Sequence, residues 1–204
     1  MTDPSVIVAK PAHPDALVLL FHGVGSTAAN LVPLAQRIAR DKPGAMVVSV
    51  AGAYPSTLGA GREWFSVAGI TEQGRPARIA QALPAFEQAV AKWQAEAGVG
   101  AGRTSLVGFS QGAIMALEAT QVTGLAARVV SLAGRFAQAP RRAPAGVAFR
   151  FIHGDVDRVI DVRFSAEAAE VLRTLGADAT AQIVPGLGHG IDARAAQLAL
   201  EALA

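Results

Sequence analysis

The order of apolar segments in this 204-residue chain predicts an α/β fold, with a mostly parallel sheet that has helices on both of its faces. Short, continuous apolar runs recur along the chain, as expected of strands that are buried on both faces. Segments with helical periodicity separate most of these runs, as the crossovers between parallel strands require. Because no repeat or long linker divides the sequence, we expect a single domain over residues 1–204.

The predicted strands are short apolar runs, and several of them lead directly into loops of small or polar residues. The run ALVLLF at 16–21 is typical, because it continues straight into His22-Gly23. Ligands of parallel α/β sheets bind at the carboxyl ends of the strands, so such loops are candidate site elements. We expect strands at 6–8, 16–21, 45–50, 105–109, 128–132, 147–152 and 179–184.

Apolar side chains spaced three and four residues apart predict the helices. The clearest pattern covers 76–97, where one stripe is formed by Ile79, Leu83, Phe86, Val90 and Trp93. Residues 51–73 show no such period and are expected to form a long irregular loop, a kind of connection that is often functional. Further helices are expected at about 30–40, after Ser110, at 163–175 and at 191–203.

Composition restricts the class of protein. The chain has no cysteine, which excludes disulfides and zinc–thiolate sites and makes a cytoplasmic location the default expectation. Its 18 basic and 16 acidic residues give a net charge of +2, and the densest basic spot is only Arg141-Arg142, so no nucleic-acid partner is expected. No apolar run reaches the ~18 residues of a membrane helix, and the start resembles no signal peptide, so no membrane partner is expected.

The segment GFSQG at 108–112 lies between a predicted strand and a predicted helix and has the spacing of a nucleophile elbow. At such a turn a strained backbone exposes the serine hydroxyl, and glycines on either side allow neighbouring backbone to come close. Ser110 is therefore the candidate nucleophile. The N–H of Gln111, at the helix start, is the first candidate oxyanion donor, and the N–H of Val24, in the loop after 16–21, is the second.

An activated serine needs a base and an acid, and in this arrangement both follow the serine, with the acid first. His189 is the histidine that meets this condition, because Asp155, Asp157 and Asp161 lie between it and Ser110. The acid would accept a hydrogen bond from the imidazole and so fix its tautomer. Spacing alone does not choose between Asp155 and Asp157.

Five segments resemble one known family in the same order along the chain. They are LFHGVGST at 20–27, GAGREWF at 59–65, GFSQG at 108–112, HGDVDRVI at 153–160 and GLGHGI at 186–191. The chain is similar to the small phospholipase/carboxylesterase family of α/β-hydrolases, which includes acyl-protein thioesterases and small bacterial serine esterases. The resemblance covers nearly the whole chain. It implies an α/β-hydrolase fold and a serine hydrolase that acts on carboxylic esters through an acyl-enzyme.

The resemblance also implies roles for particular residues. The acid of the family corresponds to Asp157, and its oxyanion donors correspond to the N–H groups of Val24 and Gln111. This chain departs from the family at two positions: proline commonly stands directly after the acid and again three residues later, where this chain has Arg158 and Asp161. We expect no cofactor or metal, because the chain has no nucleotide-binding glycine motif and no cluster of metal ligands.

The resemblance places Arg62, Trp64 and Phe65 in a segment that lines the substrate cleft in related proteins, although Trp64 and Phe65 are equally compatible with a place in the core. The connection at 133–146 is too short for a cap, so we expect no lid domain and an open cleft. Such a cleft favours small-molecule esters with short to medium acyl chains. The alternatives are a thioesterase or lysophospholipase and, more remotely, a hydrolase-like fold that only binds. The oligomeric state is left open.

Overall fold

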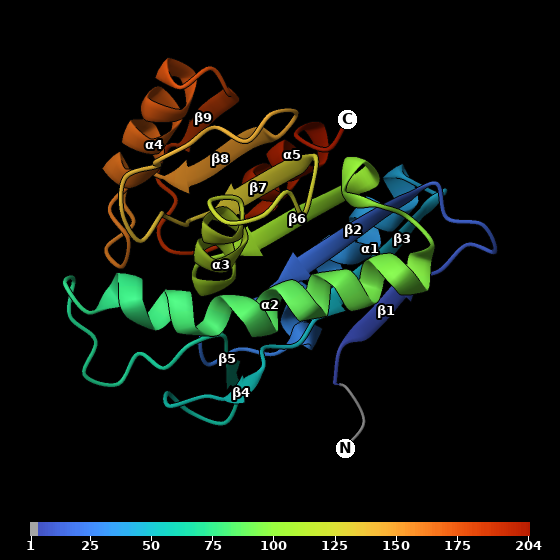
Figure 1. Cartoon of the computed structure of the whole chain (residues 1–204), viewed down its shortest axis with the longest axis horizontal. Helices are drawn as coiled ribbons and strands as arrows, with labels where there is room; N and C mark the ends of the chain where they lie inside the picture. The colour runs from blue at the N-terminus through green and yellow to red at the C-terminus, as the bar shows by residue number, and fades with distance from the viewer. Residues whose placement is uncertain (1–3) are drawn as a thin grey trace.

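The computed structural model describes residues 4–204 and is built around a seven-stranded sheet with the order β1-β3-β2-β6-β7-β8-β9 (Figure 1). Neighbouring strands run parallel, except that β1 pairs antiparallel with β3 at one edge. This arrangement confirms the predicted mostly parallel α/β fold. The strands are β1 (Val6–Ala9), β2 (Ala16–Phe21), β3 (Ala45–Val50), β6 (Thr104–Phe109), β7 (Arg128–Leu132), β8 (Ala148–Gly154) and β9 (Asp178–Val184).

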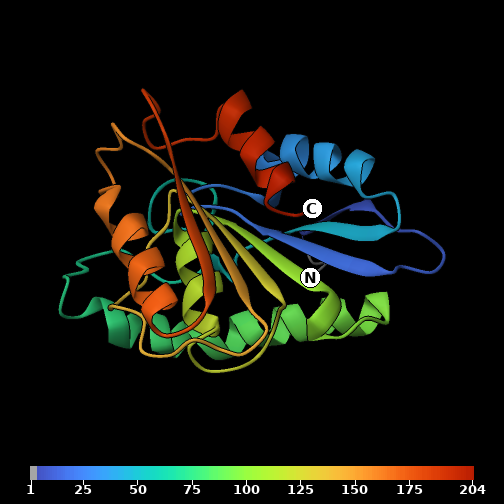
Figure 2. The same cartoon turned by 90° about the horizontal axis from the view of Figure 1, so that it is seen from above.

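Helices cover both faces of the sheet, as Figure 2 shows. On one face lie α1 (Val32–Asp41) and α5 (Ala193–Glu201), and on the other lie α2 (Arg75–Ala97), α3 (Gln111–Ala119) and α4 (Arg163–Thr174). Each face has its own apolar core because successive strand side chains point to opposite sides. In β2, Leu19 and Phe21 belong to the core under α2 and α3, whereas Val18 and Leu20 belong to the core under α1 and α5.

The long helix α2 buries the predicted stripe of apolar side chains against the sheet. Pro76 stands in its first turn, where the missing N–H costs no helical bond. The helix ends at Gly98, which adopts the left-handed conformation with φ of 68°. Although α2 has 23 residues, no helix within residues 4–204 is long and apolar enough to cross a membrane.

The segment 51–73, expected to be irregular, contains one small regular element. Strands β4 (Tyr54–Pro55) and β5 (Arg62–Glu63) form a two-residue antiparallel pair, too short to show an alternating pattern in the sequence. The segment otherwise follows turns and bends until α2 begins. Residues 133–147, which follow β7, contain no helix and form no separate cap in the described structure.

The parallel register brings the candidate site loops to one edge of the sheet, the one formed by the carboxyl ends of the parallel strands. Phe21 at the end of β2 pairs with Gly108, and Gly154 at the end of β8 pairs with Val184. The turn after β6 is tied to β7 because the N–H of Ser110 donates to the carbonyl of Leu132 over 2.9 Å. The loops after β2, β6, β8 and β9 therefore leave from the same edge.

Gly112 packs closely against the backbone at the end of β2, and this contact should contribute to the stability of the protein. A Cβ atom added at Gly112 would lie 2.2 Å from the carbonyl oxygen of Phe21 and 2.7 Å from that of His22. These backbone atoms cannot rotate away, so we expect Gly112→Ala to lower the free energy of unfolding by about 1–3 kcal/mol. Urea titration monitored by circular dichroism measures this change.

Gly102→Ala is the matched control, because a Cβ atom at Gly102 would meet nothing within 4 Å. We expect this variant to unfold within about 0.5 kcal/mol of the wild type. Equal unfolding free energies for Gly112→Ala and the wild type would show that the backbone contact is not as tight as the structure indicates.

Candidate active site

Ser110 occupies a sharp turn between β6 and α3. Its backbone has φ of 52° and ψ of −117°, a strained conformation for a residue with a side chain. The turn is held because Ser110 donates its N–H to Leu132, while its carbonyl accepts the N–H of Ile114 over 3.0 Å. Gly108 is required on the strand side, since a Cβ atom there would lie 2.3 Å from Cα of Ala113.

The structure brings Ser110, His189 and Asp157 together in a continuous series of hydrogen bonds. The Ser110 Oγ lies 2.9 Å from Nε2 of His189, and Nδ1 of the same ring lies 2.7 Å from Oδ2 of Asp157. The carboxylate can only accept, so Nδ1 carries the hydrogen and Nε2 is left to accept the serine hydroxyl proton. The Asp157 side chain is fully buried, whereas the His189 side chain remains 17% exposed.

Asp155, the other candidate acid, does not contact the imidazole. Its Oδ1 accepts the N–H of Gly186 over 2.6 Å. That bond ties the end of β8 to the glycine-rich loop that carries His189, which runs from 185 to 190. Asp155 therefore contacts the backbone of the loop, whereas Asp157 contacts the imidazole that the loop carries. Residue spacing alone could not distinguish these two positions.

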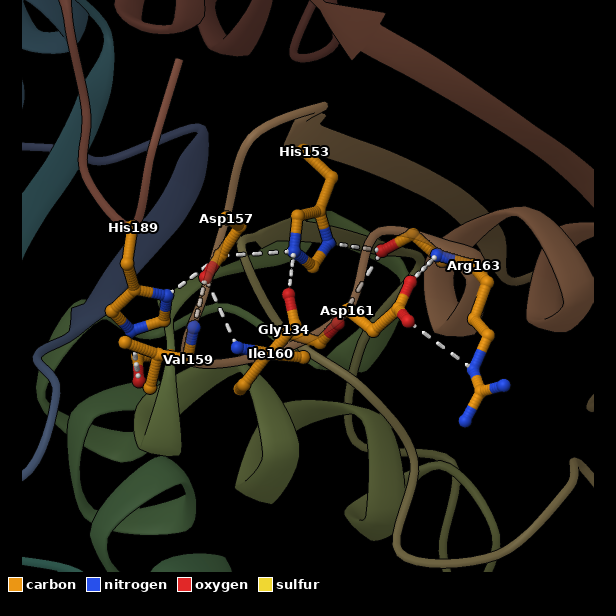
Figure 3. A network of polar contacts seen from close by, with 10 residues as sticks. Gly134, His153, Asp157, Val159, Ile160, Asp161, Arg163 and His189 are labelled. Carbon is orange, nitrogen blue, oxygen red and sulfur yellow. Dashed lines mark hydrogen bonds and ion pairs between the residues drawn. The ribbon is translucent and has the colours of Figure 1, made fainter.

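Hydrogen bonds reach the Asp157 carboxylate from several directions (Figure 3). Oδ1 accepts the N–H groups of Val159 at 2.8 Å and Ile160 at 3.0 Å, while Oδ2 faces both His189 and His153. Burial by itself would raise the pKa of Asp157. The hydrogen bonds from His189 and the two backbone N–H groups outweigh it, so the pKa lies below its usual value and the group stays ionised.

His153 is a contact of Asp157 that the sequence analysis did not identify. Its Nε2 lies 3.1 Å from Asp157 Oδ2 and 2.9 Å from the carbonyl of Ile160, and the side chain is fully buried. Both neighbours accept hydrogen bonds, so Nε2 carries a hydrogen. Its Nδ1 lies 2.7 Å from the Ser165 hydroxyl in α4. Figure 3 shows His189 and His153 on opposite sides of Asp157.

Two backbone N–H groups are free at the positions expected for oxyanion donors. No acceptor within residues 4–204 is found for the N–H of Gln111 or of Val24, and both residues line the same cleft as Ser110. The Gln111 side chain is occupied elsewhere: its Oε1 accepts the N–H of Trp64 over 2.8 Å, and its Nε2 donates to the carbonyl of Phe65 over 2.6 Å. This clamp holds the segment after β5 against the turn.

His22 holds the loop that carries Val24. Its Nδ1 donates to the carbonyl of Gly23 over 2.7 Å, and its Nε2 accepts the N–H of Gly52 over 2.9 Å, a pattern that needs the neutral ring. Burial lowers the pKa of His22, which favours the same form. The carbonyl of His22 accepts the indole N–H of Trp64 over 2.8 Å.

The three residues predicted to bind substrate, Arg62, Trp64 and Phe65, lie in different surroundings. Arg62 donates to the carbonyls of Gly52 and Ala53, and so braces the start of the 51–73 segment. Trp64 is almost fully buried, with its ring 5.4 Å from that of Phe21, and belongs to the core. Neither Arg62 nor Trp64 is among the residues that line the cleft containing Ser110, so the structure gives no support to their predicted role as substrate contacts. Phe65 does line it, beside Ser110.

The cleft at Ser110 has a volume of about 280 Å³ and combines an apolar wall with three charged side chains. The wall is formed by aromatic and branched aliphatic residues, including Phe65, Val67, Ile70, Ile114, Ile160 and Phe164. The charged side chains are those of Glu72, Arg75 and Arg135.

Comparison with known proteins identifies the family to which this chain belongs. The model of the phospholipase/carboxylesterase family matches residues 2–204. Esterase YpfH of Escherichia coli K12 is 46% identical over 199 residues, which cover 97% of this chain and 86% of that protein. The structure of esterase PE8 is similar with a TM-score of 0.89 at 30% identity, covering 99% of this chain and 97% of that one.

A carboxylesterase from Mesorhizobium loti is similar with a TM-score of 0.75 at 25% identity, covering 95% of this chain and 90% of that one. The family match extends over nearly the whole chain and includes every segment that reaches the Ser110 turn. The chain belongs to the phospholipase/carboxylesterase family and has the α/β-hydrolase fold.

Proposed function

We propose that this protein is a serine esterase that cleaves small carboxylic esters through an acyl-enzyme on Ser110, with His189 as the base and Asp157 as the orienting acid. The observation that carries the proposal is the hydrogen-bonded series from Ser110 Oγ through His189 to Asp157, at the wall of an apolar cleft. Membership of the phospholipase/carboxylesterase family and the 46% identity to an esterase support ester hydrolysis as the reaction.

In the first half of the reaction, Nε2 of His189 takes the hydroxyl proton as Ser110 Oγ bonds to the ester carbonyl carbon. The carbonyl oxygen gains a negative charge, which the N–H groups of Gln111 and Val24 are placed to stabilise. His189 then gives the proton to the departing alkoxide oxygen. The alcohol leaves, and the acyl group remains bonded to Ser110.

In the second half, water takes the place of the alcohol. It gives a proton to His189 as its oxygen bonds to the acyl carbon, and Ser110 recovers that proton when the carboxylic acid departs. The Asp157 carboxylate stays ionised throughout and stabilises the imidazolium that forms in each half. Through its bond to Asp157 Oδ2, His153 holds the carboxylate in line with the His189 ring.

The first prediction concerns the nucleophile. Ser110→Ala removes the attacking oxygen, and because the three residues act as a unit, kcat should fall by about 10⁴–10⁶-fold. Hydrolysis of p-nitrophenyl butyrate measures this loss. Ser105→Ala, near the opposite edge of the sheet, is the control and should keep near wild-type activity. A Ser110→Ala variant that kept a tenth of the wild-type activity would rule Ser110 out.

The second prediction concerns the acid and pH. Since His189 accepts the serine proton only when neutral, kcat/KM should fall as pH is lowered and the ring becomes protonated. The lowered pKa of Asp157 keeps this carboxylate ionised over that range, so one titrating group should describe the acid limb of the pH profile.

Asp157→Asn should lower kcat by about 10²–10⁴-fold, because the His189 ring loses its fixed tautomer and its counter-charge.

Asp155→Asn is the matched comparison, because Asp155 contacts the loop backbone and not the ring. Its expected effect on kcat is less than about tenfold, through small displacement of His189. If Asp155→Asn proved the more damaging substitution, the acid would have been assigned to the wrong aspartate.

The third prediction concerns acyl-chain length. Each added methylene contributes about 0.8 kcal/mol only while it covers apolar wall, and a cleft of about 280 Å³ without a cap offers little of it. On p-nitrophenyl esters from acetate to palmitate, kcat/KM should rise and then level off at medium length. A value that climbs steadily to palmitate, or a jump in rate above the critical micelle concentration, would contradict the open cleft.

A further inference from the structure

Two arginines and one glutamate form an ion-pair group inside the cleft that contains Ser110. The Glu72 carboxylate lies 2.8 Å from Nη2 of Arg75 and 3.0 Å from Nη2 of Arg135. Glu72 is 65% exposed at the cleft mouth, whereas the Arg75 and Arg135 side chains are only 19% and 12% exposed. One acidic and two basic side chains give the group a formal charge of +1.

Both guanidinium groups contact Glu72, and neither has all its donors used. Arg135 stacks on the ring of Phe164 at 3.9 Å and donates its Nε to the carbonyl of Phe136. Arg75 donates to Glu72, but its buried Nε has no hydrogen-bond partner among residues 4–204. A planar guanidinium with unused donors is well suited to bind a carboxylate.

A second hollow continues from the cleft and adds further positive charge. It shares Glu72 and Arg135 with the cleft and is also lined by Arg158, Asp161 and Arg163. Asp161 and Arg163 form an ion pair, drawn as a dashed line in Figure 3, in which Nε of Arg163 lies 3.5 Å from Oδ2 of Asp161. Arg158, directly after the buried Asp157, has no hydrogen bond or ion pair to any of residues 4–204.

The charges of the two joined hollows therefore do not balance. Outside the Ser110, His189 and Asp157 set, they contain four arginines and two carboxylates. Positive charge gathered along a partly enclosed cleft attracts and concentrates anionic substrates. The positive residues are Arg75, Arg135, Arg158 and Arg163.

We propose that the cleft selects esters that carry a carboxylate group away from the scissile bond, with Arg75, Arg135 and Arg158 as its recognition residues. This inference rests on the proposed esterase function and specifies its substrate class. In the free protein the Glu72 carboxylate occupies the place of the substrate anion between Arg75 and Arg135. The hydrogen bond from Arg75 lowers the pKa of Glu72, so Glu72 competes as a carboxylate.

The test compares ester pairs that differ by one negative charge. In one pair, mono(4-nitrophenyl) glutarate places the carboxylate at the end of the acyl chain, and 4-nitrophenyl valerate is the neutral counterpart of equal length. In the other pair, 3-carboxy-4-nitrophenyl valerate places it on the leaving group. Each kcat/KM value is divided by the rate of hydroxide hydrolysis, which removes differences in intrinsic reactivity.

In at least one pair the wild type should favour the anionic ester by about fivefold or more at low ionic strength, and 0.5 M NaCl should reduce the preference. Arg158→Gln should lower the anionic-to-neutral ratio about threefold. Glu72→Gln should raise it about threefold, because Arg75 and Arg135 lose their internal partner. Arg103→Gln, an exposed change before β6 at the opposite sheet edge, is the control and should leave the ratio unchanged.

The opposite signs expected for Arg158→Gln and Glu72→Gln separate recognition from a general structural effect, which would lower the activity on both esters. A wild-type ratio near one in both pairs would overturn the proposal, as would ratios that neither substitution changes. Failure of the wild type to hydrolyse neutral 4-nitrophenyl valerate would instead argue against the esterase function itself. The two failures are thus distinguishable.

Discussion

The close approach of backbone to backbone at the sheet edge is the constraint on which the site depends. A Cβ atom at Gly108, Gly112 or Gly154 would come within 2.3 Å of neighbouring main-chain atoms. Gly112 packs on the end of β2, which leads to the loop of Val24, and Gly154 packs on Leu187 in the loop of His189. These contacts hold the three loops in fixed relation to the strained turn, and this relation lets a hydroxyl, an imidazole and two N–H groups converge.

Asp157 is the second organising feature, because both imidazoles of the site and the backbone after β8 donate to it. Its carboxylate is buried, yet four neighbouring donors compensate for the loss of water and favour the ionised form. His153 connects this carboxylate to Ser165 at the start of α4, so Asp157 is anchored to α4 as well as to its own loop. This arrangement fixes the tautomer of His189 and leaves its second ring nitrogen, Nε2, free to accept the proton of the Ser110 hydroxyl.

Much of the fold followed from the sequence, because strands buried on both faces and a regular helical stripe are local patterns. The sharp turn at Ser110 was also predictable, since the close backbone contacts that require its glycines are marked within the five residues 108–112. Side-chain contacts that depend on how a loop turns, or on which distant segments meet, could not be predicted from the sequence. Asp155 and Asp157 are equivalent in spacing, and only the direction of the turn separates them. The place of Trp64 in the core depends on its packing on Phe21, a contact between distant segments that the sequence left open. His153 lies only four residues before Asp157, but whether the two side chains meet depends on the turn after β8, which residue spacing does not reveal.

A serine-directed fluorophosphonate tests most directly whether Ser110 forms the acyl-enzyme with the help of His189. Intact mass measurement followed by peptide mapping should show one adduct per chain, on the peptide that contains Ser110, with much slower labelling in His189→Ala. An adduct on another serine would contradict the account. So would a wild-type protein that hydrolyses esters at full rate after treatment without forming the Ser110 adduct.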